Sequence, residues 1–125
     1  MSNPKVLIIE DEPGTAEMYR IVLEVEGYEV HIAHTSSSAL KFLDQMKPDL
    51  ILLDVVLRSS SGLDLCRTIR DDLGYNELPI VIVSVRGSPS DVEAGFAAGA
   101  NDYLRKPVTQ DELLEAVRKG LEEVD

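Results

Sequence analysis

Cysteine is nearly absent from this sequence: Cys66 is the only one among 125 residues, so no internal disulfide can form. Long apolar runs are missing too, and none approaches the roughly 20 residues that a membrane-spanning helix needs. The first five residues lack the charged and apolar regions of a secretory signal peptide. Together these absences predict a cytoplasmic location without membrane association.

Positive charge is also scarce. Lys and Arg number 12 against 23 Asp and Glu, which gives a formal net charge of -11 at pH 7. A surface of this sign repels phosphate backbones and anionic lipids. We therefore expect no direct nucleic-acid binding.

The composition is that of a single globular domain. Hydrophobic residues make up 44% of the chain and charged residues 28%. A chain of this length can bury roughly two-thirds of the surface that its unfolded state exposes, which suffices for a core without disulfides. The prediction is one domain covering residues 1–125.

The spacing of apolar residues alternates between strand and helix patterns. Continuous apolar runs at 6–9, 50–53 and 80–83 are typical of strands buried on both faces. Gly27 is placed for a left-handed helix cap, and residues 28–33 then form a more polar strand near an edge. Helical spacing between the strands is shown by Met18, Ile21, Val22 and Val25, by Ala39, Phe42, Leu43 and Met46, and by Leu65, Cys66 and Ile69.

The second half of the chain repeats this alternation. Residues 88–91, Ser-Pro-Ser-Asp, carry the signals of a helix start, and that helix should run to about Ala98. Residues 103–105 form a brief last strand, and residues 109–112 have capping-box spacing before a final helix. Five strand and helix pairs predict an α/β three-layer sandwich, in which five helices cover both faces of a doubly wound, five-stranded parallel sheet.

Charged and hydroxyl residues follow the predicted strands, where open parallel sheets bind their ligands. Glu10 and Asp11 come after the first strand, Asp54 after the third, Ser84 after the fourth and Lys106 after the last. Clustered carboxylates share a proton or bind a hard cation, for which Mg²⁺ is the natural candidate. A lysine and a hydroxyl suit the oxygens of a transferring phosphoryl group.

Over its whole length the chain resembles the receiver domains of two-component response regulators, including the single-domain chemotaxis regulators. The motifs that carry the resemblance are Glu10-Asp11-Glu12-Pro13, Leu52-Leu53-Asp54, Ser61-Gly62, Ser84, Asp102-Tyr103 and Lys106-Pro107. The resemblance implies a flavodoxin-like fold with strand order 2-1-3-4-5. It also implies a cis peptide bond between Lys106 and Pro107.

The resemblance assigns roles to these residues. Asp54 would be the phosphoacceptor, taking a phosphoryl group from a phosphohistidine of a sensor histidine kinase or phosphotransfer protein, or from a small phosphodonor. Asp11, Asp54 and the backbone carbonyl of Val56 would bind Mg²⁺, or Mn²⁺ in its place, and Glu10 would help through water. Lys106 and Ser84 would contact the phosphoryl group.

The resemblance also implies a switch. Ser84 and Tyr103 would move together and remodel the surface of roughly residues 90–121, the expected fourth helix, fifth strand and fifth helix. That surface would signal to a downstream effector that the sequence does not identify, and it would allow a homodimer. The chain would catalyse only its own phosphorylation and dephosphorylation.

Several positions depart from the common pattern of the family. Glu10 replaces a more frequent aspartate, Arg58 a proline, Val85 a small alanine and Val108 a phenylalanine. We expect Val56, Val85 and Arg86 to influence the rates of phosphorylation and dephosphorylation. His31, His34 and Cys66 are assigned no function.

Three alternatives stay open at this point. A receiver-like scaffold would bind partners without being phosphorylated. A Mg²⁺-dependent phosphatase with an aspartate nucleophile would need a second acid two residues after Asp54, where Val56 stands. A nucleotide or flavin module would need a glycine-rich or hydroxyl-rich phosphate loop after the first strand, where the acids of residues 10–12 would instead repel phosphate.

Overall fold

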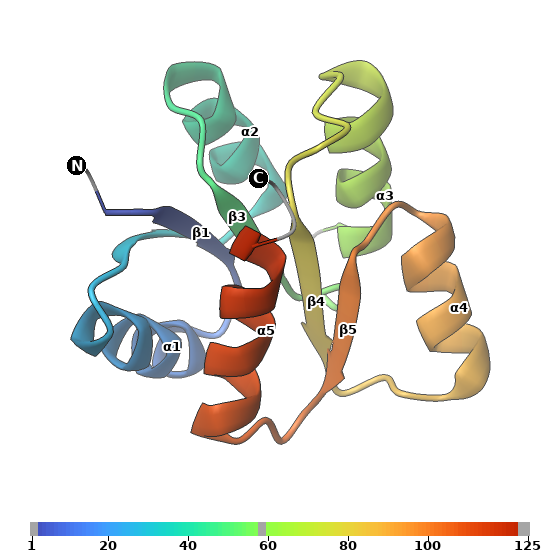
Figure 1. Cartoon of the computed structure of the whole chain (residues 1–125). Coiled ribbons are helices and arrows are strands. Elements are labelled where there is room, and N and C mark those ends of the chain that lie inside the picture. The colour runs from blue at the N-terminus through green and yellow to red at the C-terminus, as the bar shows by residue number, and fades with distance from the viewer. Residues whose placement is uncertain (1–2, 58–59, 123–125) are drawn as a thin grey trace.

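The computed structural model describes residues 3–57 and 60–122. Its centre is a sheet of five parallel strands in the order β2-β1-β3-β4-β5 (Figure 1). The strands are β1 (Lys5–Ile9), β2 (Glu29–Ala33), β3 (Leu50–Leu53), β4 (Ile80–Ser84) and β5 (Asp102–Arg105). The predicted doubly wound fold and its strand order are therefore confirmed.

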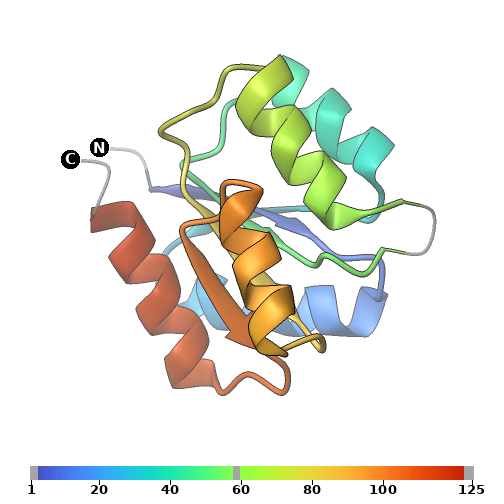
Figure 2. The same ribbon diagram turned by 90° about the vertical axis from the view of Figure 1, so that its right-hand side faces the viewer.

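Helices cover both faces of this sheet (Figures 1 and 2). They are α1 (Pro13–Val25), α2 (Ser36–Gln45), α3 (Gly62–Arg67), which continues into a π-helical turn (Thr68–Asp72), α4 (Pro89–Ala97) and α5 (Gln110–Glu122). Buried residues of α1 and α5 pack on one face, and those of α2 and α3 pack on the other. Neighbouring β1 residues alternate between the two cores: Val6 and Ile8 face one, and Leu7 and Ile9 face the other. This explains the unbroken apolar runs, because no side of these strands meets water.

Local signals in the sequence set the helix ends. Thr109 accepts a hydrogen bond from the backbone N–H of Glu112 at 3.0 Å, and the Glu112 side chain accepts one in return, so the predicted capping box at the start of α5 is present. Ser88 and Asp91 form the same arrangement at the start of α4. Gly27, just after α1, has a φ of 93°, in the left-handed region that favours glycine.

One helix is rotated relative to the prediction. Of the four residues predicted to form the apolar face of α1, Met18, Ile21 and Val25 are 53%, 55% and 76% exposed, and only Val22 packs, partly buried, against the core. The residues that face the sheet are instead Ala16, Tyr19 and Leu23. Both sets have helical spacing, and hydrophobicity favours the set that the structure leaves exposed. The physical reason for the error is that packing selects the stripe whose shapes fit against β1 and α5, and hydrophobicity alone does not reveal that fit.

No described helix is both long enough and apolar enough to cross a membrane.

Candidate functional site

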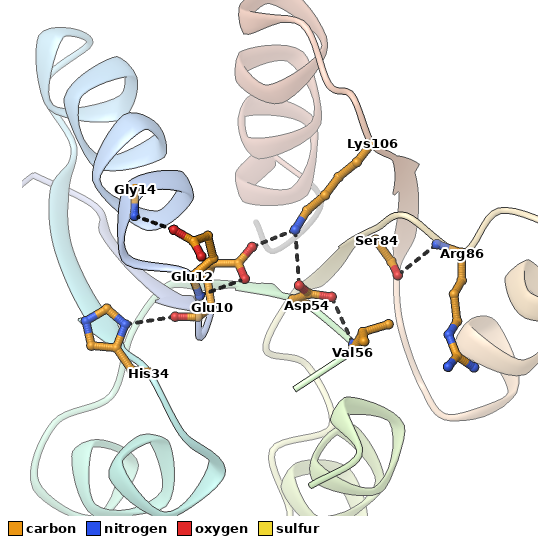
Figure 3. A network of polar contacts seen from close by, with 9 residues as sticks. All are labelled: Glu10, Glu12, Gly14, His34, Asp54, Val56, Ser84, Arg86 and Lys106. Carbon is orange, nitrogen blue, oxygen red and sulfur yellow. Dashed lines mark hydrogen bonds and ion pairs between the residues drawn. The ribbon is translucent and has the colours of Figure 1, made fainter. Parts of the chain in front are cut away.

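Polar side chains from four strands meet at one edge of the sheet (Figure 3). Glu10 follows β1, Asp54 follows β3, Ser84 ends β4, and Lys106 follows β5. Ile9 and Leu53 are partners in the register of β1 and β3, so the two acids that come next leave the sheet side by side. The sheet thus brings together residues up to 96 positions apart in the chain.

Three carboxylates form the centre of this site. Glu10, Asp11 and Asp54 each offer an oxygen, and these oxygens all lie within 4.8 Å of one another. Glu10 is 2% exposed and Asp54 is 7% exposed. Carboxylates this close repel one another, and a hard divalent cation that takes oxygen ligands relieves the repulsion. The chemistry of this donor set therefore fits a bound divalent cation.

Lys106 places its ammonium group between two of the acids. Its Nζ lies 2.7 Å from Oε1 of Glu10 and 3.1 Å from Oδ2 of Asp54. Burial alone would lower the pKa of Lys106, but the hydrogen bonds and charges of Glu10 and Asp54 outweigh burial and raise that pKa. Lys106 is thus a fixed cation at neutral pH. Its peptide bond to Pro107 is cis, as predicted.

Glu10 is held from two sides. Oε1 accepts the bond from Lys106, and Oε2 accepts one from the backbone N–H of Glu12 at 3.3 Å. Burial raises the pKa of Glu10; the bond from Lys106 opposes that rise, and the charge of Asp54 adds to it. The carboxylate therefore connects Lys106 to the loop that carries Asp11.

The loop after β3 fixes Asp54. The backbone N–H of Val56 donates to Oδ1 of Asp54 at 2.9 Å. Gly62 closes the loop, because its N–H donates to the carbonyl of Val55 at 3.0 Å. A Cβ atom at Gly62 would lie 2.4 Å from the Asp54 carbonyl oxygen, so the close approach of this backbone requires glycine.

Ser84 and Tyr103 share a contact with one loop residue, Arg86. Ser84 is fully buried, and its Oγ accepts a hydrogen bond from the backbone N–H of Arg86 at 3.2 Å. The hydroxyl of Tyr103 donates to the Arg86 carbonyl. On α4, a Cβ at Gly95 would lie 2.8 Å from the Tyr103 ring, so the ring packs directly against that helix. A continuous set of contacts therefore runs from Ser84 through the Arg86 backbone and Tyr103 to α4.

The sequence-family model of the response regulator receiver domain matches residues 6–118 of the chain. The chain belongs to this family.

Known relatives of this receiver domain include transcription regulators. MtrA of Mycolicibacterium smegmatis, a DNA-binding response regulator, is 38% identical over 117 residues, which are 94% of this chain and 50% of MtrA. PhoB of Rhizobium meliloti, a phosphate regulon transcriptional regulatory protein, is 37% identical over 118 residues, which are 94% and 52% of the two chains. The receiver domain thus spans about half the length of these relatives.

The fold match extends to solved structures. A CheY-like response regulator receiver domain protein from Methanospirillum hungatei superposes with a TM-score of 0.91 at 28% identity, and the match covers 98% of this chain and 97% of that one.

The relatives contradict the expectation of no direct nucleic-acid binding. MtrA is itself a DNA-binding regulator. The expectation rested on the net charge of -11, which is a property of the residues in this chain alone. Because those residues match only about half of MtrA, their charge carries no information on what the other half of such a regulator binds.

Besides Glu10, two of the departures from the family pattern lie among the described residues. Val85 is 63% exposed. Val108 is partly buried against the core beneath α1 and α5. Val56 is 38% exposed, and the guanidinium of Arg86 points away from Asp54 in Figure 3. Arg58 lies outside the described residues.

One residue that contacts the site, His34, was assigned no function from the sequence. His34 follows β2, and its ring bonds the backbone carbonyl of Glu10. The rule that placed the other site residues, the position directly after a parallel strand, also applies to His34. No ligand-like residue stands near His34 in the sequence, so its neighbours gave no sign of this contact.

Proposed function

We propose that residues 1–125 form one receiver domain that accepts a phosphoryl group on Asp54 and changes its surface in response. The observation that carries the proposal is the ammonium group of Lys106, held 3.1 Å from Oδ2 of a nearly buried Asp54 beside two further acids. The donor would be the phosphohistidine of a sensor histidine kinase or phosphotransfer protein. A cytoplasmic location belongs to the same proposal.

The metal in this proposal is Mg²⁺, for which Mn²⁺ can substitute. Asp11, Asp54 and the backbone carbonyl of Val56 would hold it directly, and Glu10 would contact it through water. When bound, it neutralises charge on the phosphoryl oxygens and on the acids that surround them.

In the transfer step, a carboxylate oxygen of Asp54 forms a bond to phosphorus while the bond from phosphorus to the donor nitrogen breaks. The nitrogen keeps the electron pair of that bond, and an aspartyl phosphate results. Lys106 is already charged and close enough to pair with the incoming oxygens. Ser84 lies on the adjacent strand with a hydroxyl that can donate to the same group. Attack of water on the acyl phosphate later restores Asp54, so the chain acts only on its own phosphoryl group.

The new charge would be transmitted through Ser84 and Tyr103. A phosphoryl group adds about -1.5 to -2 charges and three acceptor oxygens, which attract the hydroxyl of Ser84. That movement would disturb the Arg86 backbone, which Ser84 and Tyr103 both contact. The surface of α4, β5 and α5 would then bind an effector or a second copy of the chain.

The relatives suggest which process the phosphorylated domain controls. Because MtrA binds DNA and PhoB is a transcriptional regulator, we infer that this receiver domain controls transcription, through an attached domain or through a partner.

Acetyl phosphate tests the proposal without the natural kinase. We expect the mass of the wild-type chain to rise by one phosphoryl group in the presence of Mg²⁺, and we expect no rise with a chelator present. Asp54→Asn should remain unlabelled, whereas Asp64→Asn, which changes an exposed acid on α3, should label normally. A wild-type mass that stays unchanged, or labelling that persists in Asp54→Asn, would rule out Asp54 as the acceptor.

A further inference from the structure

His34 makes a hydrogen bond that the proposed chemistry does not use. It is the first residue after β2, and its side chain is exposed. Its Nδ1 lies 2.9 Å from the backbone carbonyl oxygen of Glu10, as Figure 3 shows. A carbonyl oxygen can only accept, so Nδ1 carries the proton and His34 is the donor.

The bond lies where the pairing of two strands ends. Ile9 of β1 and Ala33 of β2 are the last partners in the register, and the N–H of Glu10 still donates to the Ala33 carbonyl at 3.0 Å. On the side of β1 that faces β2, the next backbone acceptor is the carbonyl of Glu10. His34 satisfies it with a side chain instead of a backbone N–H.

The peptide group held in this way joins Glu10 to Asp11, two members of the acid cluster. Its orientation sets the direction in which the chain leaves β1 and therefore where the Asp11 side chain begins. Glu10 has further restraints, from Lys106 at 2.7 Å and from the backbone N–H of Glu12 at 3.3 Å. His34 restrains the carbonyl side of the same peptide.

We propose that His34 is a positioning residue for the cation site: it fixes the peptide between Glu10 and Asp11 and so keeps the Asp11 carboxylate within reach of Asp54. The inference rests on the proposed function, because the cation concerned is the Mg²⁺ of the phosphorylation site. His34 contacts neither the cation nor the phosphoryl group. Its effect is on cation affinity.

Two variants at this position separate the hydrogen bond from the presence of a side chain. His34→Ala removes the donor. His34→Asn keeps one, because the amide nitrogen of asparagine is attached at the same distance along the side chain as Nδ1 of histidine. His31→Ala is the matched control, since His31 lies on β2, just before His34, but bonds Glu29 and contacts the Phe42 ring. Exposure of His34 favours correct folding of its variants, which circular dichroism and thermal melts would verify.

The first measurement is calorimetric titration of each 125-residue variant with Mg²⁺, and with Mn²⁺ as a second probe. We expect His34→Ala to bind about tenfold more weakly, the lower end of the effect of removing a group that orients a metal ligand. His34→Asn should recover most of the affinity, and His31→Ala should match the wild type. Labelling by acetyl phosphate at saturating Mg²⁺ should be the same in His31→Ala and in the wild type.

The second measurement needs no cation. Amide hydrogen exchange of Asp11 and Glu12 in the metal-free protein should be faster in His34→Ala than in the wild type and His34→Asn. Equal affinities and equal exchange in wild type and His34→Ala would overturn the inference and leave the proposed function intact. A wild type that binds neither cation would instead remove the metal site from the proposed function, and the inference with it.

Discussion

Replacing Lys106 by methionine would show how much the acid cluster destabilises the fold when no lysine balances its charge. At an effective dielectric constant of about 20, charges at 2.7 and 3.1 Å attract by about 6 and 5 kcal/mol. Desolvation of the three groups offsets most of this attraction. Removing one partner of a buried ion pair costs about 3 to 5 kcal/mol, and the Lys106 side chain is still 18% exposed. We therefore expect a loss near the lower end, about 3 kcal/mol of unfolding free energy at pH 7 without Mg²⁺.

Urea unfolding followed by circular dichroism would measure this loss. Lys119→Met is the matched control, because it also removes one positive charge but from an exposed position on α5. The loss in Lys106→Met should shrink when Mg²⁺ is added or when acid protonates Glu10, since either change neutralises the charge that the lysine balanced. If both variants lose the same amount at pH 7, net charge alone explains the result and the ion pairs contribute nothing specific.

Three further substitutions test other features of the site. Gly62→Ala should cost about 1 to 3 kcal/mol in urea unfolding, because its Cβ would meet the Asp54 carbonyl at 2.4 Å and backbone has to shift. Gly95→Ala should move the ring of Tyr103, seen as changed ring proton shifts in NMR, since the contact would be 2.8 Å. Burial raises the pKa of Glu10, so the folded state binds the Glu10 proton more tightly than the unfolded state does. The resulting stabilisation is complete at pH values below 4.5, the ordinary pKa, and is lost as the pH rises through the raised pKa. Glu10→Gln should remove that component from the pH dependence of stability, and an unchanged pH profile would contradict the assignment.

The sheet was predictable because its strands are covered on both faces. Strands such as β1 and β3 bury every side chain from Val6 to Ile9 and from Leu50 to Leu53, so their sequences are unbroken apolar runs. The face of α1 was not predictable in the same way. That helix carries two apolar stripes, and the less hydrophobic one, with Ala16 at its start, packs against the sheet.

The positions of the site residues followed from the same logic, since parallel strands end at one edge and their next residues must meet there. The contacts between those residues depended on side-chain length and could not be predicted. Glu10 was expected to act on a metal-bound water. In the structure its carboxylate reaches Lys106 at 2.7 Å, closer than Asp54 does at 3.1 Å.

That difference in reach gives the replacement of aspartate by glutamate a physical meaning. A side chain with one more methylene group extends from the end of β1 to the ammonium group of Lys106 while its other oxygen holds the N–H of Glu12. Asp54 therefore shares the ammonium group of Lys106 with the almost fully buried carboxylate of Glu10. Any group that approaches Asp54 has to compete with Glu10 for Lys106, so the first acid of this receiver domain acts on the lysine as well as belonging to the acid cluster.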